Sequence, residues 1–185
     1  MRSKKQLMPL NIEMRELRPE DAEDAARVHE AVAALDDWEF LLSNYVQDEE
    51  FCNYLDRVAS WKEAATVPQG MVDATFLVAV IDGKIAGRLS IRHRLNDFLA
   101  LVGGHIGYGV APEFRGQGVA TFMLRYGLDF MKERGEEKIF ISCHSENEAS
   151  RKVIEKCGGE FAALVPHPYE DGELFRTYWI PTGLK

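Results

Sequence analysis

The sequence has little of several features that mark particular classes of protein. It contains only three cysteines in 185 residues, an odd and sparse set that is typical of a reducing compartment, so we expect a cytoplasmic protein. No Cys-x-x-Cys pair or close histidine pair is present, so we expect no metal site. No apolar run approaches the roughly 18 residues of a membrane span, and we expect no membrane association.

Positive charge is also in deficit. The chain has 22 Lys and Arg against 30 Asp and Glu, a net charge of −8. This balance argues against a nucleic-acid partner and favours a cationic amine as ligand. The first ten residues, MRSKKQLMPL, are basic but no apolar segment follows them. We therefore expect residues 1–10 to be a flexible tail rather than a signal peptide, and residues 11–185 to form a single domain.

The most informative stretch is residues 104–128. Residues 105–110 are rich in β-branched and aromatic side chains and predict a strand, and Pro112 indicates a turn after it. A glycine-rich segment from Arg115 then opens a helix, whose apolar positions recur at intervals of three and four residues.

A strand, a turn and a glycine-rich helix start together favour an anion site. The first N–H groups of a helix have no intrahelical partner, and the helix dipole adds positive potential there. Gly116 and Gly118 allow close approach to the backbone, which suits a phosphate or pyrophosphate. The alternative is that the two glycines only ease the turn into an ordinary amphipathic helix. The stretch is neither GxGxxG nor GxxxxGK[ST], so it lacks the dinucleotide and nucleoside-triphosphate fingerprints.

Two blocks of the sequence resemble one known family. Arg115-x-x-Gly118-x-Ala120 resembles the [RQ]-x-x-G-x-[GA] signature of the GNAT superfamily of acyl-CoA-dependent N-acetyltransferases. Residues 138–143, a predicted strand, followed by the predicted helix 147–157, resemble the family's second block. The resemblance implies acetyl-CoA as the co-substrate, and its pantetheine arm would pair with the strand. The implied cofactor-binding residues are Tyr108, Gly109, Val110, Arg115, Gly116, Gln117, Gly118, Val119, Ala120 and Asn147. Asn147 has a second reading, as the N-cap of its helix.

The chain departs from the family at the positions that carry acid and base. Where many relatives place a Glu or His on the fourth strand, this sequence has Gly104 and Ile106, and Ile154 stands where many carry a tyrosine acid. The remaining catalytic candidates are His105, Tyr108 and His144, the histidines because they titrate near neutral pH. Desolvation and a chain of waters are the alternative to a dedicated base.

The other elements follow from periodicity and turn residues. The expected strands are 11–17, 75–81, 84–94, 136–143, 160–165 and 173–180, and the expected helices are 18–35, 48–65 and 147–157, with 96–103 as a loop. In strand 84–94, Ile85, Gly87, Leu89 and Ile91 should share one face, and Arg88, Ser90, Arg92 and Arg94 the other. The expected fold class is mixed α/β (α+β): a GNAT-like domain with a central, mostly antiparallel mixed sheet and helices on both faces.

The sequence says least about the identity of the acceptor substrate. The family resemblance implies that the acidic, aromatic connector with Trp38, Glu39 and Phe40 borders the acceptor pocket; it could instead be a capping loop. We expect an N-acetyltransferase that moves an acetyl group from acetyl-CoA to a primary amine of a small-molecule or amino-acid-like acceptor, by direct attack in a ternary complex. The alternative is a non-catalytic acyl-CoA-binding sensor. A homodimer is compatible with either.

Overall fold

The computed structural model describes residues 11–35, 39–41, 45 and 49–183. Residues 1–10, and with them the predicted tail, lie outside the described residues. The elements in chain order are β1 (Glu13–Arg15), α1 (Ala22–Ala33), α2 (Phe51–Ser60), β2 (Ala74–Ile81), β3 (Lys84–Arg92), α3 (Asp97–Leu101), β4 (Ile106–Val110), α4 (Val119–Glu133), β5 (Lys138–His144), α5 (Glu148–Lys156), β6 (Glu160–Pro166) and β7 (Leu174–Pro181), with short 3-10 turns at Pro19–Asp21 and Pro112–Phe114.

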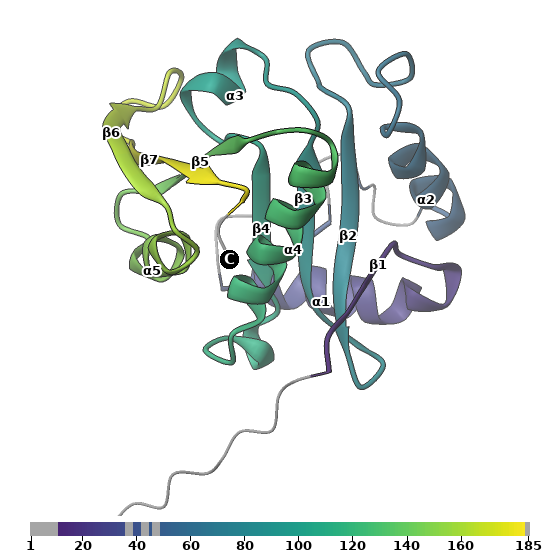
Figure 1. Ribbon diagram of the computed structural model, residues 1–185. Helices are drawn as coiled ribbons and strands as arrows, with labels where there is room; N and C mark the ends of the chain where they lie inside the picture. The colour runs from purple at the N-terminus through teal and green to yellow at the C-terminus, as the bar shows by residue number, and fades with distance from the viewer. Residues whose placement is uncertain (1–10, 36–38, 42–44, 46–48, 184–185) are drawn as a thin grey trace, which may run out of the picture.

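The strands form two sheets that meet at one point. One sheet has the order β1-β2-β3-β4 and the other β5-β7-β6, and neighbouring strands within each are antiparallel. A single bridge between Gly104 and Ile141 joins them, and β4 and β5 diverge from that point (Figure 1). The expected mixed α/β class with mostly antiparallel strands is confirmed, and the sheet is divided in two.

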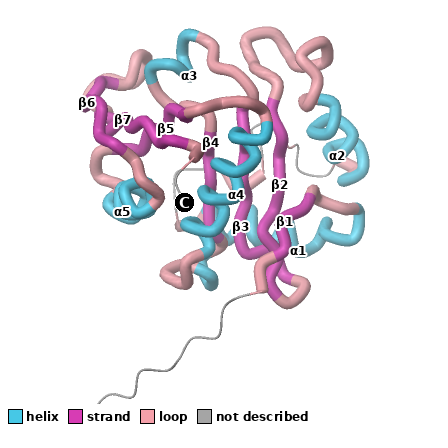
Figure 2. Tube along the Cα trace, in the orientation of Figure 1, coloured by secondary structure: helices cyan, strands magenta, loops and turns pink. Residues whose placement is uncertain are grey.

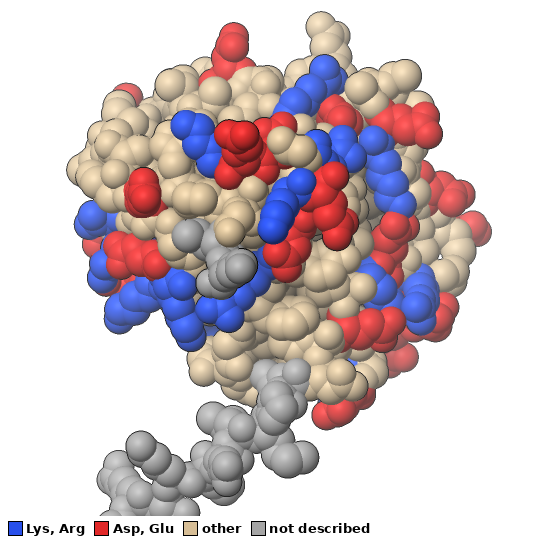
Figure 3. All heavy atoms as spheres, in the orientation of Figure 1, with Lys and Arg blue, Asp and Glu red and all other residues tan. Residues whose placement is uncertain are grey.

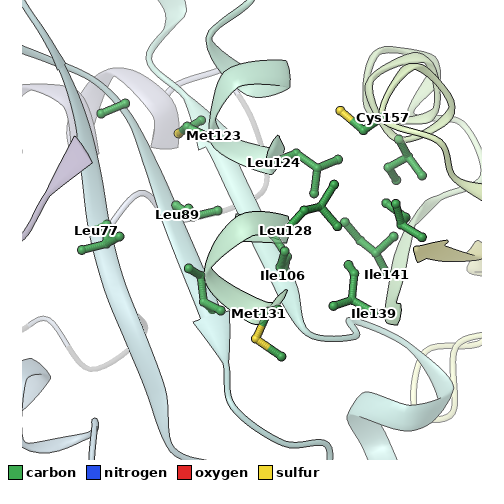
Figure 4. Close-up of a cluster of buried hydrophobic side chains, with 14 of the residues drawn as sticks. Leu77, Leu89, Ile106, Met123, Leu124, Leu128, Met131, Ile139, Ile141 and Cys157 are labelled. Atoms are coloured by element: carbon green, nitrogen blue, oxygen red, sulfur yellow. The ribbon is translucent and has the colours of Figure 1, made fainter. Parts of the chain in front are cut away.

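Helices cover both faces of the four-stranded sheet, as expected. Figure 2 shows α4 crossing in front of β3 and β4, with α1 behind the sheet. The α4 side of the sheet shares a core with β5, α5 and β7, and Figure 4 shows Leu124 and Leu128 of α4 between Leu89 and Ile141. The other face packs on α1 and α2 through residues such as Val28, Tyr54 and Val78. Each large apolar side chain buried in this way contributes about 1.5–3 kcal/mol.

An irregularity in the β2–β3 ladder corrects the predicted faces of β3. The register passes from Ala79↔Gly87 to Val80↔Ile85, so Ala86 is an extra residue. Because side chains alternate along a strand, one extra residue moves the preceding ones to the opposite face. Ile85 therefore packs with the α1 and α2 core, whereas Leu89 packs with α4.

Several predicted boundaries also change. The helix expected from Arg115 begins at Val119, because Gly116 and Gly118 adopt φ of +72° and +91°, outside the right-handed helical region. The expected helix 48–65 is described over Phe51–Ser60. Residues 96–103, expected as a loop, contain α3, which Asn96 caps by accepting a hydrogen bond from the Leu99 N–H at 2.9 Å.

The junction of the two sheets generates a prediction about Gly104. Its φ is +67°, and a Cβ there would lie 2.2 Å from the Phe140 carbonyl oxygen. Gly104→Ala should therefore lower the free energy of unfolding by roughly 3 kcal/mol or more, through backbone strain and overpacking together. Urea denaturation measures this.

Gly135→Ala is the matched control, because Gly135 also has positive φ (+90°) but a Cβ there would meet nothing within 4 Å. This variant should lose only the conformational cost of about 1–2 kcal/mol. Equal losses in the two variants would show that the close approach at Gly104 is not a tight constraint.

Candidate active site

A groove of about 690 Å³ lies between β4, the start of α4 and α5. Every predicted cofactor-binding residue lines it except Gln117, whose side-chain amide donates to the Glu113 carbonyl at 2.8 Å. Sequence reasoning missed several others. The full lining is Tyr108, Gly109, Val110, Phe114, Arg115, Gly116, Gly118, Val119, Ala120, Thr121, Asn147, Ala149, Ser150, Lys152, Val153 and Lys156.

The glycine turn shapes one end of this groove. Gly118 occupies the N-cap position of α4, where no side chain caps the helix. Residues of the first helical turn, Val119, Ala120 and Thr121, line the groove. The first N–H groups of a helix lack intrahelical partners and carry the positive end of its dipole, so this end of the groove attracts anions.

Basic side chains add to that potential. Arg115 borders the groove from the turn, and Lys152 and Lys156 border it from α5. Figure 3 shows Lys and Arg gathered at the lower left, over α5 and beside the start of α4. The groove is therefore locally positive although the chain carries a net charge of −8. The four-residue spacing of the two lysines is the signal in the sequence that could have placed both on one helix face.

Asn147 lies at the start of α5 and lines the groove. Its side-chain oxygen accepts a hydrogen bond from the Ser150 N–H at 2.9 Å, which is the N-cap arrangement. The side-chain NH₂ group is a separate donor, so capping the helix leaves a donor for a ligand.

Tyr108 is the only one of the three catalytic candidates that lines the groove. Its hydroxyl lies 2.8 Å from Ser150 Oγ on α5. Burial raises the pKa of this phenol, so the hydroxyl stays protonated at neutral pH and can donate a hydrogen bond. Ile154, at the position where many relatives carry a tyrosine, is fully buried in the core. The phenol at the groove thus comes from β4 and not from α5.

The two histidine candidates are engaged elsewhere. The Phe140 N–H donates to His105 Nδ1 at 2.9 Å, and the His105 N–H donates to the Phe140 carbonyl at 2.7 Å. Burial lowers the pKa of His105, so the ring is neutral and fastens β4 to β5 beside the junction. His144 pairs through Nε2 with the Glu173 carboxylate, and its Nδ1 accepts from the Glu146 N–H. The structure does not bring either ring to the groove.

The predicted acceptor-binding residues do not share one environment. Trp38 lies outside the described residues. Glu39 is exposed, whereas Phe40 is fully buried in the core beneath α1 and α2. Its burial gives Phe40 a packing role, because a side chain inside the core presents no surface to an acceptor.

The described residues supply neither a reactive thiol in the groove nor a metal site. Cys143 and Cys157 are buried, and burial raises the pKa of both thiols; Cys52 is exposed. No group of three or more His, Cys, Asp or Glu gathers among the described residues. None of the described helices is long and apolar enough to cross a membrane.

The family is identified by the match of residues 11–160 to the domain described as Acetyltransferase (GNAT) domain. The chain belongs to the GNAT acetyltransferase family. The expected class, an acetyl-CoA-dependent acyltransferase, is thereby confirmed. Membership of a family does not by itself identify the acceptor, because function depends on the site and not on the fold alone.

Three proteins with a sequence or a fold similar to this GNAT chain are known. N-alpha-acetyltransferase 30 of Schizosaccharomyces pombe is 39% identical over 49 residues, which span 26% of this chain and a third (33%) of that protein. Mycobacterium smegmatis RimJ, solved in complex with CoA-disulfide, has a TM-score of 0.70 at 23% identity, covering 92% of this chain and 81% of that one. The ribosomal-protein-S5-alanine acetyltransferase of Vibrio fischeri has a TM-score of 0.70 at 20% identity, covering 93% of each chain. The two structures support the GNAT fold.

The pairing of His105 with Phe140 generates a prediction. His105→Phe leaves the buried Phe140 N–H without an acceptor and should cost about 1–3 kcal/mol of stability. His105→Asn places an oxygen near the position of Nδ1 and should cost less. Acetyl transfer per folded molecule should stay within a few-fold of wild type in both. Urea denaturation and steady-state kinetics measure the two effects; a large loss of kcat with unchanged stability would show that His105 takes part in the chemistry.

The pH dependence follows from the same residue. Because burial lowers the pKa of His105 in the folded state, the unfolded chain binds more protons once the pH falls below about 6.5. Stability contributed by the neutral ring is present above that pH and is lost as the pH falls through it. His105→Asn should remove this part of the decline.

Proposed function

We propose that the groove binds acetyl-CoA with its pyrophosphate on residues 115–120. The observation that carries the proposal is the uncapped start of α4, which opens into a groove bordered by Arg115, Lys152 and Lys156. Backbone N–H groups and three cations match the charge of a pyrophosphate and a nearby phosphate. The pantetheine arm would run along Tyr108, Gly109 and Val110 towards the diverging strands, within reach of the Asn147 amide. RimJ, solved with a CoA-disulfide, supports this use of the fold.

We further propose that the acceptor amine attacks the thioester directly. A bond forms between the amine nitrogen and the acetyl carbon, the carbon–sulfur bond breaks, and the sulfur takes a proton while the nitrogen loses one. Tyr108 is proposed as the donor to the departing sulfur, because its phenol lies in the groove, where it is held by Ser150. An acyl-cysteine relay is disfavoured, since a relay needs a thiolate and burial raises the pKa of Cys143 and Cys157.

The groove favours an amine of low pKa. His105 and His144 are engaged away from it, and the side chains that line it include Arg and Lys but no His, Asp or Glu among the described residues. Without a base, the rate depends on the fraction of amine that is already neutral. The α-amino group of a polypeptide has a pKa near 8, whereas a lysine side chain has one near 10.4. At pH 7 the neutral fraction is therefore about several hundred times larger for the α-amino group.

The acceptor we propose is accordingly the α-amino group at the N-terminus of a polypeptide. The names of two similar proteins, an N-alpha-acetyltransferase and a ribosomal-protein-S5-alanine acetyltransferase, support it. The small-molecule amine expected from the sequence is the second candidate, supported by the net charge of −8. Measuring kcat/KM for N-terminal peptides and for small-molecule amines in the same assay distinguishes the two candidates.

Acetyl-CoA should stabilise the protein. At about 100 times its dissociation constant, a ligand that binds only the folded state adds about 2.7 kcal/mol to the free energy of unfolding. A thermal-shift titration measures this. Gly118→Asp puts a negative charge at the uncapped helix start and should abolish the shift, while Gly135→Asp, at a positive-φ glycine outside the groove, should keep it. No shift for wild type at millimolar acetyl-CoA would contradict the proposed cofactor site.

Turnover should be detected with peptides that have a free N-terminus. A release assay for CoA thiol should give higher kcat/KM for such peptides than for N-terminally blocked peptides that contain lysine, and for simple alkylamines. Tyr108→Phe should lower kcat by roughly 10²-fold or more if the phenol is the acid, with acetyl-CoA binding retained. A protein that binds acetyl-CoA but acetylates none of these acceptors would fit the sensor alternative.

A further inference from the structure

Helix α5 carries its charged side chains on two separate faces. On one face the Arg151 guanidinium donates to two carboxylates, at 2.6 Å to Glu148 Oε2 and at 2.9 Å to Glu155 Oε2. Lys152 and Lys156 lie one turn apart on the neighbouring face, which lines the groove. The helix thus pairs its acids with an arginine on one face and presents two lysines to the groove on the other.

The two lysines have no carboxylate partner. Among the residues that the structure describes, no carboxylate forms an ion pair with Lys152 or Lys156, and the side chains that line the groove include no Asp or Glu. The third cation of the groove, Arg115, donates from Nε to the Val110 carbonyl at 3.3 Å, so part of its donor set is used within the turn. An anionic ligand in the groove would therefore find both ammonium groups available.

Two contacts of α5 show which way the groove runs along this helix. Near the start of α5, Ser150 Oγ lies 2.8 Å from the Tyr108 hydroxyl of β4. Just after the end of α5, the Cys157 thiol donates to the carbonyl of Thr121, in the first turn of α4, at 3.9 Å. Lys156 directly precedes Cys157 in the chain, so the lysine end of α5 lies beside the start of α4 and away from Tyr108.

The negative charge of acetyl-CoA is divided between two groups. The pyrophosphate joins the pantetheine arm to the ribose, and a phosphomonoester on the ribose 3′ oxygen lies farther from the thioester. A phosphomonoester carries a charge of about −1.5 to −2 at pH 7, which two ammonium groups match. Residues four apart are separated by about 6 Å along a helix axis, so two flexible lysine side chains at that spacing can both reach one phosphate.

We propose that Lys152 and Lys156 bind the ribose 3′-phosphate of acetyl-CoA and make the protein selective for acetyl-CoA over 3′-dephospho-acetyl-CoA. This inference rests on the proposed cofactor site. The pyrophosphate then occupies the glycine turn and the start of α4, and the 3′-phosphate lies against α5 on the facing wall. Because the 3′-phosphate is remote from the thioester, its removal weakens binding without altering the reacting atoms.

A cycle that combines changes in the protein with a change in the ligand tests this contact. Isothermal titration calorimetry gives the dissociation constants of acetyl-CoA and 3′-dephospho-acetyl-CoA for the wild-type chain, Lys152→Met, Lys156→Met and the double variant. The wild-type chain should bind acetyl-CoA roughly tenfold more tightly, the lower end of the range for a hydrogen bond to a charged group. In the double variant the affinity for acetyl-CoA should fall to that for the dephospho form, whose own affinity should hardly change.

Lys132→Met is the matched control, because Lys132 is an exposed lysine in the last turn of α4 that does not line the groove. It removes the same charge from the chain and should keep the wild-type ratio of the two dissociation constants. Added salt should reduce that ratio in the wild-type chain, since exposed charges are screened, and should leave it unchanged in the double variant. Thermal unfolding without ligand establishes that each variant is folded.

Equal dissociation constants for the two ligands in the wild-type chain would overturn the assignment and leave the cofactor site intact. Lysine variants that weaken both ligands by the same factor would place the lysines on the pyrophosphate and would also overturn it. A ratio that falls as far in Lys132→Met would show that the total charge of the chain, and not contact with α5, selects the ligand. Failure of the wild-type chain to bind either ligand would contradict the proposed cofactor site itself, and this inference with it.

Discussion

The contact between Gly104 and the backbone of Phe140 and Ile141 is the constraint on which the rest of the structure depends. Only a residue without a side chain can approach so closely, and His105 reinforces the contact by pairing with the Phe140 backbone. The two sheets are fixed together here, and β4 and β5 part beyond it. The groove lies on the side of the junction where β4 and β5 no longer pair.

The charge around the groove is opposite in sign to the net charge of the chain. The chain carries a net charge of −8, yet the groove is bordered by Arg115, Lys152 and Lys156. Net charge describes solubility and long-range steering, and it says little about a site whose cations are gathered by the fold.

The local sequence predicted the elements that carry their own signals. The glycine turn, the helix after it and the neighbouring strands 75–81 and 84–94 were predicted from turn residues and periodicity. The face of Ile85 was predicted wrongly, because a one-residue irregularity leaves no mark on an apolar run. The engagement of His105 depends on Phe140, 35 positions away, and the place of Tyr108 depends on Ser150. Contacts of this kind depend on how distant segments pack together. A local sequence pattern does not predict that packing.

The hydrogen bond between Tyr108 of β4 and Ser150 of α5 joins the two walls of the groove. A ligand that reaches this point replaces one partner of the phenol by another, so little binding energy is gained there. In the proposed cofactor site the strongest contacts lie at the far end, on the phosphates, and that end is identical in acetyl-CoA and CoA. Such a groove would bind CoA about as tightly as acetyl-CoA. The ratio of acetyl-CoA to CoA in solution would then determine what fraction of the protein is ready for another turnover.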